Sequence, residues 1–204
     1  MKVTSISEEY VTSIPSSEFL PEMTKRSCFS GLIAEIFDRS RKHSRTSVML
    51  TSPLPQSGVS FICSSIAVEI ALHGAKVLLV DARALLSVRA HSPLTVTALC
   101  RRVGPLQLWV LGKEETAAAK PSAKNDGNNA VGTLLHELEQ DFPYLLIDAP
   151  ALSAGTDANL LAMSVYGTVI VARSGQTGES ELKRAHKSLT EFGGRLLGTV
   201  FNAH

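Results

Sequence analysis

A short glycine-containing loop is the first part of the sequence that could do chemistry. Residues 51–60 read TSPLPQSGVS and directly follow the apolar run 48–50. A loop that follows a strand and opens a helix can hold the phosphates of a nucleotide, because its backbone N–H groups point at the anion. Such loops normally carry Gly-Lys-Ser or Gly-Lys-Thr, whereas this one has Gly58-Val59-Ser60. The missing lysine raises the question whether the chain is an enzyme.

Two aspartates follow short apolar runs elsewhere in the chain. Asp81 comes after the run 77–80, and Asp148 comes after the run 144–147. In an open parallel sheet, ligands bind at the carboxyl ends of the strands. A carboxylate at such an end suits Mg²⁺, because a hard cation prefers oxygen ligands. The two aspartates and the loop together are more specific than any one of them alone.

These residues need a parallel sheet to bring them together, and the hydrophobic pattern predicts one. Strand, helix and strand within residues 48–80 make a βαβ unit, which implies parallel pairing. Further apolar runs and helical periodicities follow along the chain. The expected strands are 48–50, 77–80, 106–111, 144–147, 168–172 and 196–201, and the expected helices are 29–37, 60–73, 134–138 and 179–192. The sequence thus predicts an α/β fold, with a mostly parallel sheet of about six strands and helices on both faces.

Composition limits the classes of function. The chain has 204 residues, enough for one α/β domain with a full core, and a formal net charge of +1. A net charge this close to zero produces no strong positive potential that would attract nucleic acid, so no nucleic-acid partner is expected. Every long apolar region is interrupted by charged residues, His or Gly, and three scattered cysteines form no CxxC pair. A cytoplasmic location is expected, with a flexible tail at 1–24 and one domain at 25–204.

Five blocks of sequence, taken in order, resemble a known family. They are TSPLPQSGVSFICSSIAVEIALHGAKVLLVDAR, LQLWVLGKE, LLIDAPAL, GTVIVARSG and LGTVFN. Their order resembles the cytoplasmic ATPase domain of the bacterial tyrosine kinases (BY-kinases) of capsule and exopolysaccharide assembly. The resemblance covers about residues 30–202 and implies a P-loop NTPase-like fold with Mg-ATP or Mg-ADP as cofactor. It also implies a membrane polysaccharide co-polymerase or export protein as partner, at the inner membrane, and leaves self-association open.

The resemblance assigns roles to individual residues. Gly58 and Ser60 match the family's phosphate loop, and Asn202 matches an asparagine that contacts the adenine ring. Ser60, Asp81 and Asp148 match the Mg²⁺ site. If the chain is active, Asp81 and Asp148 are its candidate catalytic residues.

The loop departs from the family pattern at three positions. Gln56 stands in place of the first glycine, Val59 in place of the lysine, and Phe61 in place of the threonine. A residue with a Cβ pays about 1–2 kcal/mol where the loop needs a positive φ. Losing one electrostatic contact to the phosphates costs about 10²–10³ in rate. These changes predict a degenerate Walker A motif.

Arg83 stands where the family has a second acidic residue. Its guanidinium could bind phosphate and replace the missing lysine, which would make it a cofactor-binding residue. It could equally form a salt bridge with Asp81 or Asp148 and fill the cation site. The salt bridge is favoured, because nothing else would neutralise two clustered carboxylates.

Two functions follow from these observations. The first is a catalytically impaired pseudokinase that binds nucleotide weakly or not at all and acts through contact with a membrane partner. The second is an active ATP-dependent tyrosine kinase or ATPase that uses Ser60, Asp81, Asp148 and Arg83, with a missing cation supplied by a partner. A partition-type regulator that acts on DNA or membrane is disfavoured by the near-neutral charge.

Overall fold

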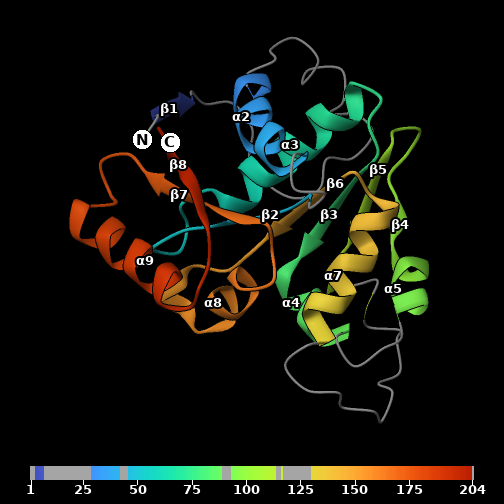
Figure 1. The fold of residues 1–204 in the computed structure, drawn as a ribbon. Helices are drawn as coiled ribbons and strands as arrows, with labels where there is room; N and C mark the ends of the chain where they lie inside the picture. The colour runs from blue at the N-terminus through green and yellow to red at the C-terminus, as the bar shows by residue number, and fades with distance from the viewer. Residues whose placement is uncertain are drawn as a thin grey trace.

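One mostly parallel sheet runs through the part of the chain that the computed structural model describes, which is residues 3–6, 29–41, 46–88, 93–113, 116 and 130–203. Eight strands are joined in the order β1-β8-β7-β2-β6-β3-β5-β4 (Figure 1). Every neighbouring pair is parallel except β4 and β5. The mostly parallel α/β sheet predicted from the sequence is confirmed.

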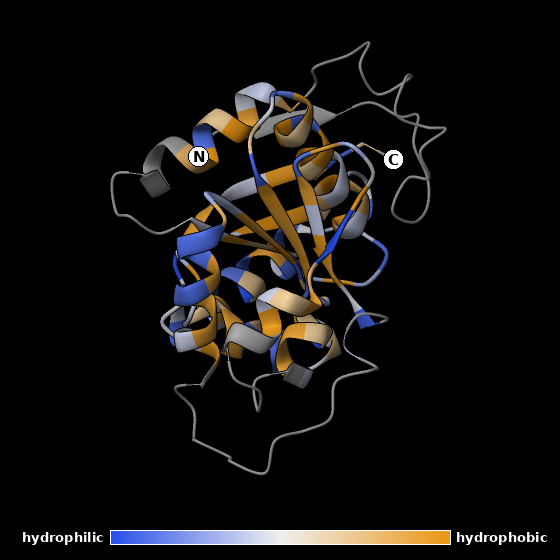
Figure 2. Ribbon diagram, turned by 90° about the vertical axis from the view of Figure 1, so that its right-hand side faces the viewer, coloured by the Kyte–Doolittle hydropathy of each residue, from blue (hydrophilic) through white to orange (hydrophobic). Residues whose placement is uncertain are grey.

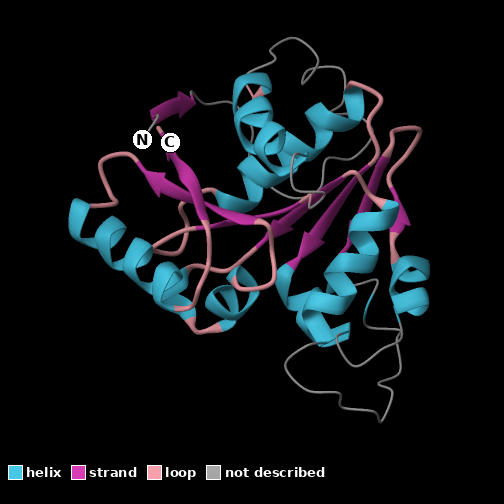
Figure 3. Ribbon diagram, in the orientation of Figure 1, coloured by secondary structure: helices cyan, strands magenta, loops and turns pink. Residues whose placement is uncertain are grey.

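The elements alternate along the chain, as a parallel sheet requires (Figure 3). The strands are β1 (Val3–Ile6), β2 (Ser47–Thr51), β3 (Val77–Asp81), β4 (Arg101–Arg102), β5 (Leu108–Leu111), β6 (Tyr144–Asp148), β7 (Gly167–Arg173) and β8 (Leu196–Asn202). The helices are α2 (Ser30–Arg41), α3 (Val59–Leu72), α4 (Ala82–Val88), α5 (Pro93–Leu99), α7 (Ala130–Asp141), α8 (Asp157–Ala162) and α9 (Glu179–Glu191), with a short 3₁₀ helix η1 (Leu152–Ala154). All six predicted strands and all four predicted helices are present. The short helices α4, α5 and α8 were not predicted, because six or seven residues are too few to show a helical period.

Helices cover both faces of the sheet, as predicted. Figure 1 shows α2 and α3 on one face and α4, α7, α8 and α9 on the other. On the first face α3 packs on β2, β3 and β6; on the second, α4 packs on β3, α7 on β6, α8 on β2 and α9 on β8. The sheet, with the β2–α3 loop at the carboxyl ends of its strands, therefore lies between two layers of helices.

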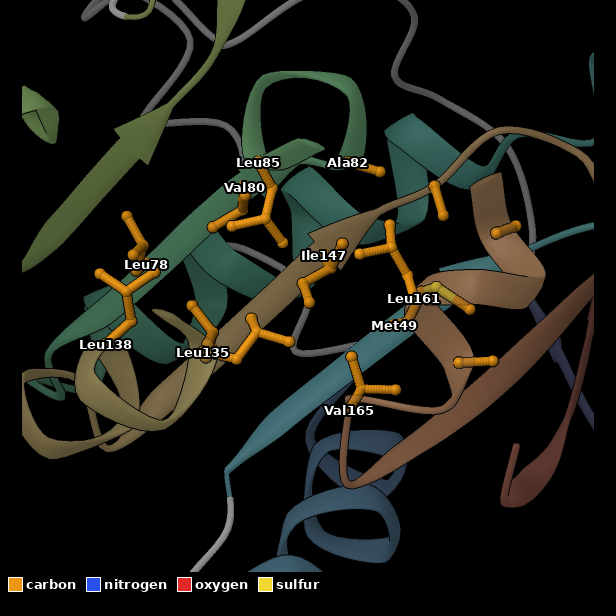
Figure 4. Packing of buried hydrophobic residues seen from close by; sticks show 14 of the residues in the cluster. Met49, Leu78, Val80, Ala82, Leu85, Leu135, Leu138, Ile147, Leu161 and Val165 are labelled. Carbon is orange, nitrogen blue, oxygen red and sulfur yellow. The ribbon is translucent and has the colours of Figure 1, made fainter. Parts of the chain in front are cut away.

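Alternate residues of each central strand supply the two cores. On β2, Met49 belongs to the core under α7 and α8, whereas Val48 and Leu50 belong to the core under α2 and α3. Figure 2 shows the strands as a hydrophobic band between the helices, and Figure 4 shows side chains from the sheet meeting Leu135 and Leu138 of α7. A strand covered on both sides has no solvent face, which is why these strands appear in the sequence as continuous apolar runs.

The N-terminal segment differs in part from its prediction. Val3–Ile6 form β1, which pairs in parallel with β8, so these four residues are an edge strand rather than part of a flexible tail. The edge of β8 offers unpaired backbone groups that an extended segment can bind. Residues 7–28 lie outside the described part of the chain, so the rest of the tail and the boundary at residue 25 stay predictions. No helix among the described residues is long and apolar enough to cross a bilayer.

Candidate functional site

The loop between β2 and α3 lies at the carboxyl edge of the sheet. Gly58 precedes α3 with φ 84°, and Gln56 has φ 61°, the one positive φ of a non-glycine residue in the described part of the chain. A Cβ on Gly58 would lie against the amide nitrogen of Asn202. The first backbone bond of the helix runs from the Ile62 N–H to the Gly58 carbonyl at 3.0 Å. The three N–H groups before Ile62 have no intrahelical acceptor, which is the arrangement that binds anions at helix N-termini.

Val59, which directly follows Gly58, has its side chain in the hydrophobic core. It is 9% exposed and belongs to the cluster under α2 and α3, where Phe61 also packs. An isopropyl group has no hydrogen-bond donor. The first turn of α3 therefore presents no side-chain cation from this position to a phosphate.

The three residues predicted to hold Mg²⁺ meet at this edge. Asp81 ends β3 and Asp148 ends β6, and the two are direct partners in the parallel register. Ser60 of α3 hydrogen-bonds the Asp148 carboxylate. Two carboxylates and a hydroxyl thus converge from three elements that are far apart in sequence.

The environment of Asp148 disfavours its charged form. Burial raises the pKa of Asp148 from 3.8 to about 6, the Ser60 hydrogen bond opposes the rise, Asp81 adds to it, and Arg83 opposes it. Burial also raises the pKa of the Cys63 thiol well above its usual value, and the negative charge of Asp148 adds to that rise. Cys63 is therefore a buried neutral thiol within the electrostatic reach of the site.

The donor set of this site suits Mg²⁺. The ion usually binds one or two carboxylates together with phosphate and water, so Ser60, Asp81 and Asp148 are appropriate ligands in kind and number. The raised pKa of Asp148 indicates that the charge of Arg83 offsets the burial of this carboxylate only in part. A bound Mg²⁺ would supply that positive charge and bridge to phosphate oxygens. Clusters of three or more His, Cys, Asp or Glu are absent from the described residues.

Arg83 does not make the salt bridge that the sequence favoured. Among the described residues no ion pair joins its guanidinium to Asp81 or Asp148. Its backbone N–H instead donates to the Asp81 Oδ1 at 2.7 Å, because Arg83 lies in the first turn of α4, directly after the strand. The side chain is exposed, and its charge reaches Asp148 only through space. Phosphate binding by Arg83 stays a prediction.

Asn202 ends β8 and contacts the loop. Its Nδ2 donates to the carbonyl of Ser57 at 3.1 Å, and the side chain is buried beside Gly58. The structure thus places Asn202 against the loop. Its role toward adenine stays a prediction.

Arg173 is a site residue that the sequence did not single out. It ends β7, and its Nη1 donates to the carbonyl of Gln56 at 3.4 Å. Its position at the end of a strand, directly before the turn SGQTG, was the available signal. That turn connects β7 to α9, as the sequence predicted, and holds Gly175 at φ 72°.

Comparison with known proteins gives the chain its relatives. No family model matches it. It is 27% identical to the putative tyrosine-protein kinase CapB of Staphylococcus aureus, over 98% of this chain and 91% of CapB. It is 29% identical to the tyrosine-protein kinase YwqD of Bacillus subtilis, over 76% of this chain and 71% of YwqD. The relatives of this chain are bacterial tyrosine kinases.

Solved structures show the same fold. The chimerical protein CapA2B2 superposes with a TM-score of 0.71 at 22% identity, over 98% of this chain and 93% of that structure. The cell division ATPase MinD of Pyrococcus furiosus superposes with a TM-score of 0.59 at 19% identity, over 78% of this chain and 73% of that structure. This homologue of the bacterial tyrosine kinases therefore has the P-loop NTPase-like fold predicted from its sequence.

In this tyrosine-kinase homologue the predicted site residues gather in two groups. Gly58 and Asn202 are in contact at the loop, and Ser60, Asp81 and Asp148 form the carboxylate group beside it. The two groups share α3, whose first turn carries Ser60. Such an arrangement can hold the phosphates of a Mg-nucleotide, apart from the lysine contact that Val59 does not supply.

Proposed function

We propose that this chain is a pseudokinase of capsule or exopolysaccharide assembly, with a degenerate Walker A motif. It keeps the fold of the bacterial tyrosine kinases and acts by contact with a membrane polysaccharide co-polymerase or export protein. Its place is then the cytoplasm, at the inner membrane surface, through that partner. Mg-ATP or Mg-ADP binds weakly or not at all.

The observation that carries this proposal is the side chain of Val59. A P-loop lysine reaches the β and γ phosphates and stabilises the charge that develops during phosphoryl transfer. The 9% exposed Val59 packs into the core instead and offers no charge. Removing one such contact costs about 10²–10³ in rate. In the described part of the chain no lysine contacts the loop, so the loss is not offset by a neighbouring ammonium.

The carboxylate group supports the same proposal. In an active enzyme, the charge of the bound Mg²⁺ favours the ionised form of a buried aspartate ligand. Here burial raises the pKa of Asp148 to about 6, so its carboxylate is protonated, and is a weaker metal ligand, below about pH 6. Asp81 ends the adjacent strand, and its negative charge adds to this effect. Binding of a Mg-nucleotide is therefore expected to weaken as the pH falls below about 6.

The membrane partner is proposed from the relatives. CapB and YwqD are named as tyrosine kinases, and the resemblance to kinases of polysaccharide assembly implies a co-polymerase or export protein. A chain that no longer transfers phosphate can still hold such a partner, because the fold and its surface are intact. Self-association through the same surface is compatible with this function.

An active ATP-dependent tyrosine kinase or ATPase is the second candidate. The observation in its favour is that Ser60, Asp81 and Asp148 still converge at one edge. Arg83 is exposed beside them and could contact phosphate, and a partner could supply a further cation. This candidate requires that the carboxylates matter for function.

Genetic complementation separates the two candidates. A strain that lacks this protein is supplied with the wild type, the Asp148→Asn variant or the Asp81→Asn/Asp148→Asn variant, and the chain length of its surface polysaccharide is measured. The matched control is Asp141→Asn, an exposed aspartate at the end of α7. A pseudokinase restores the normal chain length with all four proteins. Loss of rescue by the two site variants alone, at equal protein level, would establish the active enzyme instead.

Partner contact is tested separately with the purified proteins. The detergent-solubilised co-polymerase of the same organism is immobilised, and retention of this chain is measured with and without Mg-ATP. We expect retention that does not depend on nucleotide. Absence of retention in both conditions would refute the proposed contact.

A further inference from the structure

Two neighbouring strands end in side chains that donate to successive carbonyls of the loop. Arg173 of β7 and Asn202 of β8 are direct partners in the parallel register. The Arg173 Nη1 donates to the Gln56 carbonyl at 3.4 Å, and the Asn202 Nδ2 donates to the Ser57 carbonyl at 3.1 Å. The loop is thus held from the β7–β8 side at two consecutive peptide groups.

We propose that Arg173 and Asn202 are positioning residues. They hold the loop between β2 and α3 in its present backbone conformation, with positive φ at Gln56 and Gly58, when no nucleotide is bound. In particular, Arg173 stabilises the left-handed conformation of Gln56, which a glycine would adopt without strain. The inference rests on the proposed function only in taking this loop as the former phosphate site. It concerns the conformation of the loop and not its affinity for a ligand.

The backbone of Arg173 is fixed well enough for this role. Its N–H donates to the Thr177 Oγ1 at 2.9 Å, and its carbonyl accepts from the Thr177 N–H at 2.9 Å. The following residue, Ser174, donates its N–H to the Asn202 carbonyl at 2.7 Å. These bonds fix the backbone from which the guanidinium reaches the loop, so only side-chain freedom is lost when it binds there. Arg173 and Asn202 are also tied to one another through this last bond.

The conformation of Gln56 explains why the loop needs such support. Its φ of 61° is disfavoured for a residue with a Cβ. The hydrogen bond from the Arg173 guanidinium to the Gln56 carbonyl is exposed and 3.4 Å long, so it offsets part of that strain. Arg173 supplies this donor on the one non-glycine residue with positive φ in the described chain.

Asn202 completes the arrangement on the next peptide group. Its side chain is buried, and it fits against the loop because Gly58 has no Cβ. Each of the loop residues Gln56, Ser57 and Gly58 therefore has one contact with the end of β7 or β8. These contacts are with the Arg173 guanidinium for Gln56 and with the Asn202 amide for Ser57 and Gly58.

The test is an NMR measurement on the nucleotide-free protein. Three-bond couplings give the φ of Gln56, and the exchange rate of the Ile62 amide, which donates to the Gly58 carbonyl, gives the local opening of the loop. The variants are Arg173→Gln, Arg173→Lys, Gln56→Gly, Asn202→Ala and the Arg173→Gln/Gln56→Gly pair. The control is Arg184→Gln, an exposed arginine of α9 that pairs with Glu181.

We expect Arg173→Gln to shift the φ of Gln56 toward negative values and to speed Ile62 exchange about threefold, as expected for loss of one long, exposed hydrogen bond. Asn202→Ala also speeds Ile62 exchange, and Arg173→Lys restores most of the wild-type behaviour. With Gln56→Gly already present, Arg173→Gln changes exchange less than about twofold, because the strain is gone. An unchanged φ in Arg173→Gln, or the same change in exchange in both backgrounds, would overturn the proposal. Nucleotide takes no part in these measurements, so their outcome is independent of whether the chain is a pseudokinase.

Discussion

Asp81 and Asp148 are direct partners in the register of β3 and β6, so two carboxylates end adjacent strands at the edge that carries the loop. The closeness of like charges adds to the effect of burial, which raises the pKa of Asp148 to about 6. Ser60 and Arg83 offset this rise only in part. Two carboxylates and the Ser60 hydroxyl thus converge beside the loop, where Val59 offers no charge.

The first prediction concerns the pH dependence of stability. In the unfolded chain Asp148 ionises near its ordinary pKa of 3.8, whereas in the folded protein it keeps its proton up to about pH 6. The free energy of unfolding therefore falls as the pH rises between these values, by up to about 3 kcal/mol, and the loss persists above pH 6. Asp148→Asn removes this loss, so the variant is more stable than the wild type at pH 7.

Urea unfolding between pH 4 and pH 7.5 measures this difference. The comparison is the free energy of unfolding of Asp148→Asn minus that of the wild type, which should grow with pH and level off above pH 6. Asp141→Asn, at an exposed position, should show no such trend. A difference that stays flat across this range would contradict the environment described for Asp148.

The second prediction concerns the contact between Gly58 and Asn202. Gly58→Ala should destabilise the protein by more than the 1–2 kcal/mol that a left-handed residue costs, because the new methyl group would also strike the Asn202 amide. In an Asn202→Ala background only the cost of the positive φ remains. Chemical denaturation of the four proteins gives the coupling energy. Additive effects of the two substitutions would show that the side chains are not in contact.

The third prediction concerns the attachment of α2 to the domain. Glu69 of α3 is 8% exposed, and its carboxylate accepts from the Phe29 N–H at 3.2 Å and from the Ser30 hydroxyl at 2.5 Å. Glu69→Ala leaves these donors without their acceptor, which should cost about 1–3 kcal/mol. Hydrogen exchange along α2 should rise as well. The control Glu137→Ala, at an exposed position of α7, should stay within about 0.5 kcal/mol of the wild type. Equal effects of the two substitutions would contradict this role of Glu69.

Much of the fold could be predicted because burial leaves a direct trace in the sequence. The run 77–80 lies in a strand covered on both faces, so every residue in it is apolar. Parallel strands also bring Asp81 and Asp148 to one edge, which the order of the elements alone implies. The two-residue strand β4 and the four-residue edge strand β1 have no comparable pattern, because both are too short for a periodicity to show in the sequence.

The contacts within the site were less predictable. The sequence left Arg83 with a choice between phosphate and a salt bridge; in the structure its guanidinium forms no ion pair with Asp81 or Asp148, and its backbone N–H donates to Asp81. Arg173 contacts the loop although 117 residues separate it from Gln56. Such contacts depend on the register between β7 and β8 and on side-chain reach, and neither is encoded in local spacing.

The most direct test of the central claim is calorimetric titration of the wild type with Mg-ATP and Mg-ADP, beside Val59→Lys and Val59→Met. Methionine matches much of the length of lysine without its charge, so it controls for the displacement of Val59 from the core. The pseudokinase account predicts no binding to the wild type or to Val59→Met at about millimolar nucleotide, a dissociation constant that corresponds to about 4 kcal/mol. It predicts stronger binding by Val59→Lys. Micromolar binding of either nucleotide by the wild type would contradict the account and favour an active enzyme.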